Sequence, residues 1–185
     1  MKDITREQAL QGVRTFLEYI GEDITREGLI ETPHRFLKAW EEYWGVGYKE
    51  NPKDFIKTFN TDSSDIVCIK EIPMYSYCEH HIAPIVGKVS IVYKPKNKVL
   101  GLSKFNRIVN HFARRLVIQE NLTKDIAKFL DKNLSPYGVA IFIEAEHLCV
   151  SSRGVQQKST TYTESFTGIF EKNRYKKLIK NLIKE

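Results

Sequence analysis

Two cysteines and one histidine form the most informative pattern in the sequence. Cys78 and His81 stand three positions apart, a spacing that lets both side chains reach one metal ion, and Cys149 adds a third donor further along the chain. Two sulfurs and one imidazole suit Zn²⁺ better than Ca²⁺ or Mg²⁺, which prefer oxygen ligands. No equally clear fourth ligand stands nearby. Three protein ligands with an open position predict a catalytic zinc site, where a bound water becomes acidic enough to react near neutral pH.

Two further histidines flank the predicted ligands. His80 directly precedes His81, and His147 stands two positions before Cys149. Imidazole changes its protonation near neutral pH, so both side chains are candidates for proton transfer in a hydrolysis. The alternative is that the cysteines are small buried hydrophobes and that the paired histidines lie on the surface without a role.

The composition of the chain is typical of a globular protein with a sizeable core. Its 185 residues are 42% hydrophobic and 28% charged, which excludes a disordered or fibrous class. No secretory signal and no apolar stretch of membrane-spanning length is evident, so we expect a cytoplasmic protein without a membrane partner. Cys68 lies in the apolar run 66–69 and is interpreted as core. Three cysteines without disulfide-like spacing favour a reducing compartment.

A net charge of +6 indicates an anionic partner, which could be nucleic acid, a membrane surface or a phosphorylated metabolite. Much of the excess lies near the C-terminus, where apolar residues recur at helical spacing and predict an amphipathic helix with a basic, solvated face. The apolar positions are Leu178, Ile179, Leu182 and Ile183, and the basic ones are Lys172, Arg174, Lys176, Lys177, Lys180 and Lys184. A nucleic-acid or membrane role of this tail is a minor alternative.

The first part of the chain, 1–57, is predicted to be a helical region. Thr5 and Gln8 fit a capping box at a helix start. Thr32 followed by Pro33 predicts a second start, with a hydroxyl N-cap and proline in the first helical position.

The remainder, 58–185, is predicted to be the catalytic domain, ending in the basic helix. Alternating polar and apolar residues and continuous apolar runs predict two strands, then two helices, then two strands along the chain. The strands are expected at 66–71, 85–93, 139–145 and 159–166, and the helices around 105–112 and 122–134.

A second group of residues could bind an anion. Ser103, Lys104 and Arg107 follow Gly101-Leu102 at a predicted helix start, where backbone N–H groups and cations favour phosphate. A capped helix with solvated charges is the alternative. Arg153, followed by Gly154, adds a cation close to Cys149. Glu120, next to Gln119, could accept hydrogen bonds from the donor edge of guanine, or could simply be a charge at a helix N-terminus.

Several separated motifs together resemble the GTP cyclohydrolase I family over residues 6–170. These motifs are Arg26–Leu29, Thr32–Arg35, Cys78–His81, Gly101–Arg107, Gln119–Thr123, Glu144–Cys149 and Arg153–Val155. The resemblance implies an α+β tunnelling fold, in which an antiparallel four-stranded sheet has two helices inserted between its middle strands. It also implies a homodecamer of two pentamers with active sites between subunits. The implied reaction converts GTP and water into formate and 7,8-dihydroneopterin triphosphate, the entry to folate and pterin synthesis.

The resemblance also implies roles for single residues. Cys78, His81 and Cys149 match zinc ligands, and His80 and His147 match proton-transferring histidines, with Ser103 near the ribose. In the substrate-binding set, Glu120 matches the guanine anchor, with Gln119 beside it, and Leu102 belongs to the Gly101–Arg107 motif. Lys104, Arg107 and Arg153 match triphosphate contacts, and Arg35 and Lys38 match basic residues that a neighbouring subunit contributes to the triphosphate.

Two positions depart from the family pattern, and three other readings compete with it. The family usually has proline where Leu116 stands and arginine where Asn121 stands.

A zinc nucleobase deaminase would show His-x-Glu and Pro-Cys-x-x-Cys signatures, which are absent. A nitrile reductase of the same fold would lack the zinc ligands. A zinc-stabilised RNA-binding module without catalysis would need four closed ligands and stacking aromatics.

Overall fold

The computed structural model describes residues 3–184, without the side chain of Lys184, so residues 1, 2 and 185 of the predicted regions lie outside it. The chain forms two compact units, Met1–Val46 and Gly47–Glu185, which are described separately. The division comes earlier than the predicted boundary at residue 57. Gly47 and Tyr48 already belong to the second unit, because their N–H and hydroxyl groups bond to the backbone of Arg114 and Leu116. Within the described residues, no helix is long and apolar enough to cross a membrane.

The first unit is helical, as predicted. Helix α1 (Arg6–Tyr19) begins with the expected capping box between Thr5 and Gln8. Helix α2 (Thr32–Ala39) continues into the π-helical turn η1 (Trp40–Trp44). The predicted N-cap at Thr32 is wrong: Glu31 is the N-cap and Thr32 is the first helical residue. The Thr32 hydroxyl instead donates to the carbonyl of Gly28, at 3.3 Å, so it is not free to cap α2.

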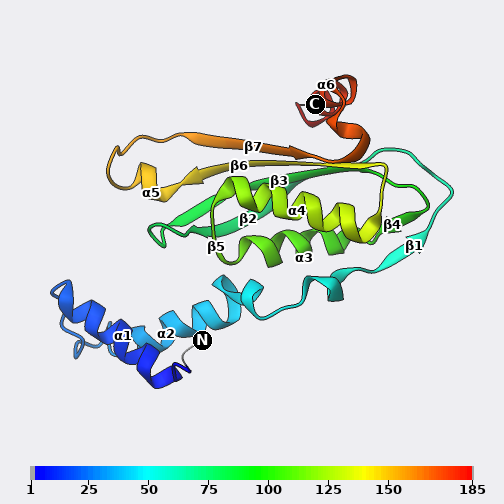
Figure 1. Ribbon diagram of the computed structural model, residues 1–185. Helices are drawn as coiled ribbons and strands as arrows, with labels where there is room; N and C mark the ends of the chain where they lie inside the picture. Colours follow the sequence, from blue (N-terminus) through cyan, green and yellow to red (C-terminus); the bar gives the residue numbers. More distant parts are fainter. Residues whose placement is uncertain (1–2, 185) are drawn as a thin grey trace. The chain divides into compact units, whose positions relative to one another are not determined.

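The second unit combines one main sheet with helices (Figure 1). Its strands pair in the order β5-β2-β3-β6-β7, and β1 and β4 form a separate pair. The elements in chain order are η2 (Val46–Tyr48), η3 (Pro52–Phe55), β1 (Thr58–Asn60), β2 (Val67–Cys78), β3 (Pro84–Lys94), β4 (Lys98–Leu100), α3 (Leu102–Ala113), β5 (Leu116–Val117), α4 (Gln119–Leu134), β6 (Gly138–His147), α5 (Leu148–Ser151), β7 (Thr160–Phe166), η4 (Gly168–Glu171) and α6 (Asn173–Lys184).

The α+β class is confirmed, whereas the four-strand description of the sheet is incomplete. Strands β2, β3, β6 and β7 pair antiparallel to their neighbours, and α3 and α4 lie between β3 and β6 in the sequence. The fifth strand, β5, pairs parallel to β2 at its end, Leu116 with Tyr77 and Val117 with Cys78. A two-residue strand has no detectable alternation, which is why the sequence pattern did not predict it.

Strand β6 is apolar on both faces because different layers cover them. In β6, Ile141 and Ile143 belong to the core under α3 and α4, whereas Ala140 and Phe142 belong to a second core that includes α6. Alternating side chains point to opposite faces of a strand, so covering both faces explains the continuous apolar run at 139–143. Figure 1 shows α3 and α4 on one side of the sheet and α6 on the other.

Strand β2 is longer than predicted because a β-bulge carries it past Glu71. Ile69 pairs with Ile91 and Ile72 with Val89, so β2 has one extra residue in this interval. Glu71 takes a positive φ of 56°, and its N–H donates to the Ser90 hydroxyl at 3.2 Å instead of joining the ladder. Beyond the bulge, Pro73 is tolerated because β2 has an outer neighbour only at its last two residues.

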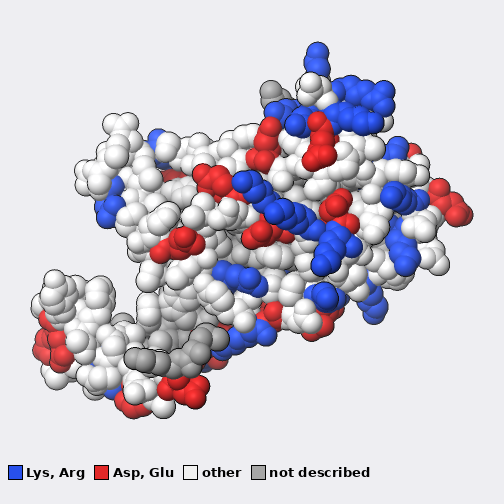
Figure 2. Space-filling view, in the orientation of Figure 1, with Lys and Arg blue, Asp and Glu red and all other residues white. Residues whose placement is uncertain are grey.

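The terminal helix is amphipathic, with one correction to its predicted apolar face. Ile179 is fully buried and Leu182 and Ile183 pack against the second core, but Leu178 is 51% exposed. Basic side chains gather over α6 in Figure 2. One of the lysines of α6, Lys180, forms an ion pair with Glu164 of β7 at 2.7 Å. Helix α6 is therefore part of the folded unit and not a detached tail.

The packing of α6 predicts a difference between two adjacent positions. Ile179→Ala should lower the free energy of unfolding by about 2–4 kcal/mol, because it leaves a cavity between α6 and the sheet. Leu178→Ala, the matched control on the exposed side, should change it by about 0.5 kcal/mol or less. Urea unfolding followed by circular dichroism measures both. Equal effects of the two substitutions would contradict this placement of α6.

Candidate metal centre

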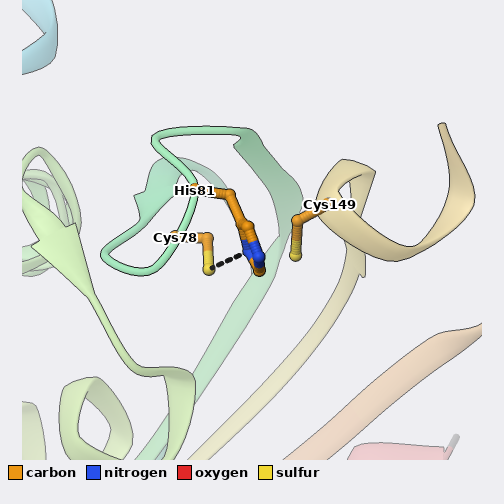
Figure 3. Close-up of side chains that lie close together, drawn as sticks. All are labelled: Cys78, His81 and Cys149. Atoms are coloured by element: carbon orange, nitrogen blue, oxygen red, sulfur yellow. Dashed lines mark hydrogen bonds between the residues drawn. The ribbon is translucent and has the colours of Figure 1, made fainter. Parts of the chain in front are cut away.

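Three predicted ligands lie together at one end of the sheet. Cys78 is the last residue of β2, His81 stands in the turn before β3, and Cys149 lies in α5, directly after β6. Pairing of Tyr77 with Pro84 and of Ile85 with His147 brings these segments to the same edge. The three side chains point toward one another in Figure 3, and their ligand atoms all lie within 4.8 Å of one another.

The geometry of this group fits a tetrahedral metal ion. The Sγ atom of Cys78 lies 3.8 Å from Nδ1 of His81, close to the roughly 3.5 Å that separates a sulfur and a nitrogen bound to the same zinc. Both cysteines are buried, whereas His81 is exposed. Among residues 3–184, no fourth His, Cys, Asp or Glu joins the group. Three soft donors with one open side are the donor set of a catalytic site rather than a closed structural one.

The turn that carries Cys78 and His81 is fixed by backbone hydrogen bonds. The N–H of Ile82 donates to the carbonyl of Cys78 at 2.8 Å, and the N–H of Cys78 donates to that of Ala83 at 2.9 Å. Ile82 takes a positive φ of 53° to close the turn. From the other side, the N–H of Glu79 donates to the carbonyl of Val117 in β5, at 3.2 Å. The ligand turn is therefore held by two different strands.

The electrostatics of the group favour a bound cation. Burial raises the pKa of the Cys149 thiol, the neighbouring Cys78 raises it further, and Arg153 acts in the opposite direction. Nη2 of Arg153 lies 3.1 Å from Nε2 of His81, and its Nε donates to the carbonyl of Cys149 at 3.2 Å. Two adjacent buried thiolates repel each other, so a divalent cation between them would favour the ionised form of both.

The two candidate proton-transfer histidines contact different neighbours, one of them a predicted ligand. Nδ1 of His80 lies 3.6 Å from Sγ of Cys78. Nε2 of His147 lies 2.7 Å from Oε1 of Gln119. Burial lowers the pKa of His147, and the charge of Glu120 acts in the opposite direction. Gln119 and Glu120 begin α4, and Gln119 is buried while Glu120 is exposed. His147 is therefore a neutral imidazole near neutral pH, able to accept a proton.

Comparison with known proteins decides the family. The profile of GTP cyclohydrolase I matches residues 9–183. The chain is 48% identical over 171 residues to GTP cyclohydrolase 1 of Sinorhizobium fredii, covering 90% of this chain and 83% of that relative. It is also 48% identical over 164 residues to GTP cyclohydrolase 1 of Campylobacter jejuni, covering 87% and 86% of the two chains.

The chain belongs to the GTP cyclohydrolase I family.

Family membership confirms the predicted function and enzyme class. The chain is a hydrolase of a cyclic amidine that converts GTP to 7,8-dihydroneopterin triphosphate in folate and pterin synthesis. The alternative of a non-catalytic RNA-binding module is set aside, as are the deaminase and nitrile reductase.

Among solved structures, the crystal structure of an archaeosine synthase QueF-like protein in its apo form matches 57% of this chain and 96% of the QueF-like chain. The TM-score is 0.45 and the sequence identity is 20%.

The remaining predicted site residues of this family member fall into separate places. Arg153 joins the metal group, as described. Leu102, Ser103, Lys104 and Arg107 occupy the first two turns of α3, whose N-cap, Gly101, makes no side-chain capping bond. In the described part of the chain, no hydrogen bond or ion pair links these four residues to the metal group. Arg35 and Lys38 are exposed on α2, in the first unit.

Two residues around the site were not predicted from the sequence. Thr123 in α4 and Thr163 in β7 hold the buried Gln119, and their hydroxyl oxygens lie 2.7 Å apart. Thr123 belongs to the family motif Gln119–Thr123, and Thr163 belongs to the strand predicted at 159–166. Their contact joins a helix to a strand far away in the sequence, so spacing alone could not predict it.

The geometry predicts which cysteines carry the metal. Cys149→Ser should reduce bound zinc from about one ion per chain to a small fraction, because a serine hydroxyl is a poor replacement for a thiolate ligand. Cys68→Ser is the matched control, since Cys68 packs against the second core, and it should keep the metal. Elemental analysis of the purified, dialysed proteins measures both. Equal zinc contents in the two variants would contradict the assignment.

Proposed function

We propose that this member of the family binds Zn²⁺ through Cys78, His81 and Cys149, and that its reaction takes place at this group. The observation that carries the proposal is the convergence of two buried thiols and one imidazole within 4.8 Å, with no fourth such ligand among residues 3–184. When bound, the ion supplies an activated water for opening the imidazole ring of guanine. The soft donor set favours zinc over Mg²⁺ and Ca²⁺.

His80 and His147 transfer protons during the hydrolysis. His80 lies beside the Cys78 ligand, and His147 is the last residue of β6, where its imidazole contacts Gln119. Opening the ring at C8, expelling formate and rearranging the ribose each require proton exchange. An imidazole that is neutral near pH 7 can accept a proton in one step and return it in the next.

Charged residues bind the parts of GTP that do not react. Glu120 is exposed at the start of α4, next to Gln119, and its carboxylate accepts hydrogen bonds from the N1–H and amino group of guanine. Arg153, within hydrogen-bonding distance of His81, contacts the triphosphate. The binding energy of the base and the triphosphate positions C8 for reaction.

The position of α3 supports an active site shared between copies of the chain. Helix α3 ends next to β5, which pairs with Cys78. Because α3 has 12 residues, its first turn lies about 18 Å from that end. Ser103 and Lys104, in that first turn, therefore lie well away from the metal group of their own chain, and Arg107 lies about one turn further along α3. We propose that they serve the ribose and triphosphate at the metal group of a neighbouring copy, with Leu102 in the same turn.

A shared site agrees with the homodecamer of two pentamers that we propose for the assembled enzyme. In this assembly, the exposed Arg35 and Lys38 of α2 add positive charge near the triphosphate of a neighbouring copy. We further propose that the enzyme works in the cytoplasm, where a reducing environment would keep Cys78 and Cys149 as free thiols.

Activity assays test the catalytic assignment. With GTP and Zn²⁺, the purified protein should form a product that yields fluorescent neopterin after oxidation and dephosphorylation. His147→Ala and His80→Ala should each lower kcat by roughly 10²- to 10⁴-fold, because proton transfer is lost. Equilibrium dialysis should show unchanged GTP binding, and elemental analysis should show that the zinc is retained. Wild-type turnover in both variants would refute the role of these histidines.

Mixing experiments test the shared site. Cys149→Ser and the double variant Lys104→Ala/Arg107→Ala should each be inactive alone. Co-expressed with different affinity tags and purified through both, the mixed oligomers should recover activity, up to about a quarter of wild type for random assembly. Mixing two preparations of the Cys149→Ser variant is the control. Mixed oligomers as inactive as their parents would contradict a site built from two copies.

A further inference from the structure

Gln119 is the most completely hydrogen-bonded polar side chain near the metal group. It is the first residue of α4, and only 1% of its surface is exposed. Its Nε2 lies 3.3 Å from the carbonyl of Ile143, 3.1 Å from that of Thr161 and 3.0 Å from Oγ1 of Thr163. At the other end of the amide, Oε1 lies 2.7 Å from Nε2 of His147.

These partners fix the orientation of the Gln119 amide. Backbone carbonyls only accept hydrogen bonds, so the end of the amide that faces Ile143 and Thr161 must be the NH₂ group. A flipped amide would place its oxygen against two carbonyl oxygens. The end that faces His147 is therefore the oxygen, which cannot donate. It follows that Nε2 of His147 carries a proton and donates it to Oε1 of Gln119.

Two threonines lock this orientation in place. The hydroxyl of Thr123 donates to the backbone carbonyl of Gln119 at 2.7 Å. Since that proton is used, the 2.7 Å contact between Thr123 and Thr163 requires Thr163 to be the donor. Thr163 in turn accepts from Nε2 of Gln119. The three residues thus form a closed ring in which each hydroxyl both donates and accepts, and such rings strengthen their members.

We infer that Gln119 is a positioning residue that holds His147 as the Nε2–H tautomer. In the neutral imidazole, this leaves the lone pair on Nδ1. When His147 takes a proton in the reaction, the proton goes to Nδ1, and the Nε2–H bond to Gln119 stabilises the resulting cation. The inference rests on the proposed proton-transfer role of His147. It assigns Gln119 to the histidine and not to direct contact with the guanine.

The arrangement has a precedent in the general design of catalytic histidines. An imidazole needs one nitrogen occupied so that the other is presented in a defined protonation state. An amide oxygen performs this task without adding a negative charge beside Glu120. Because the amide is held from strands β6 and β7, the imidazole is fixed relative to the sheet, whose strand β6 leads directly into the helix that carries Cys149.

A double-mutant cycle tests the inference. Gln119→Met keeps the size of the side chain and removes the hydrogen bonds, so kcat should fall roughly 10- to 100-fold while the KM for GTP stays within about two-fold. In the His147→Ala background, the same change should cause no further loss, because Gln119 acts only through His147. Zinc content and the unfolding temperature check that the variant is folded and loaded with metal.

A second variant and a spectroscopic measurement test the inference even if Gln119→Met does not fold. Thr163→Val breaks the ring without touching His147 and should lower kcat several-fold, again only when His147 is present. Solid-state ¹⁵N NMR of histidine-labelled enzyme, with the His147 signal identified by its loss in His147→Ala, should show protonated Nε2 in the wild type and a mixture of tautomers in the variants.

The outcomes separate this inference from the proposed function. Wild-type turnover by His147→Ala would overturn the role of His147 itself. Inactive His147→Ala together with fully active Gln119→Met and Thr163→Val would overturn only the positioning role. A raised KM with unchanged kcat in Gln119→Met would make Gln119 a substrate contact instead. Additive losses in the double variant would show that Gln119 acts independently of His147.

Discussion

The antiparallel register of β2, β3 and β6 is the constraint on which the site depends. The metal group needs the end of β2, the turn before β3 and the short helix α5 that follows β6 at one edge of the sheet, and the pairs Tyr77–Pro84 and Ile85–His147 place them there. A slip of one residue would turn each strand's buried side chains to the opposite face. The two different apolar cores on the two faces of β6 oppose such a slip. Hydrophobic packing far from the metal thereby sets the positions of the ligands.

The second physical condition at this edge is charge. Two buried thiols lie beside each other, and in the absence of a cation burial keeps the pKa of Cys149 raised. A divalent ion bound there would lower the pKa of both thiols, because it would stabilise both thiolates and the turn that carries His81. Arg153 adds a permanent positive charge at the same place, through its contacts with His81 and with the carbonyl of Cys149. Metal binding and the structure of this edge are therefore coupled.

Sequence reasoning predicted the features that repeat or that follow fixed spacings. The capping box at Thr5, the alternation along β3 and the ligand trio all have such signals. It failed where tertiary contacts override local preference. Thr32 has the residue type of an N-cap, yet its hydroxyl is used by Gly28. Strand β2 passes through Pro73, which only an edge position permits. The ring of Gln119, Thr123 and Thr163 joins three elements and leaves no periodic trace in the sequence.

The departure at position 116 has a consequence that the structure makes visible. The N–H of Leu116 donates to the hydroxyl of Tyr48 at 2.9 Å, a bond that proline could not make because it lacks the N–H. In this chain, β5 is thus tied to Tyr48 on one side and to the end of β2 on the other. The carbonyl of Val117, the next residue, accepts a hydrogen bond from the N–H of Glu79, which adjoins the Cys78 ligand. The hydrogen bond between Tyr48 and Leu116 is therefore only a few backbone bonds away from the turn that carries Cys78 and His81. Asn121 is exposed on α4, and nothing in the structure explains its departure.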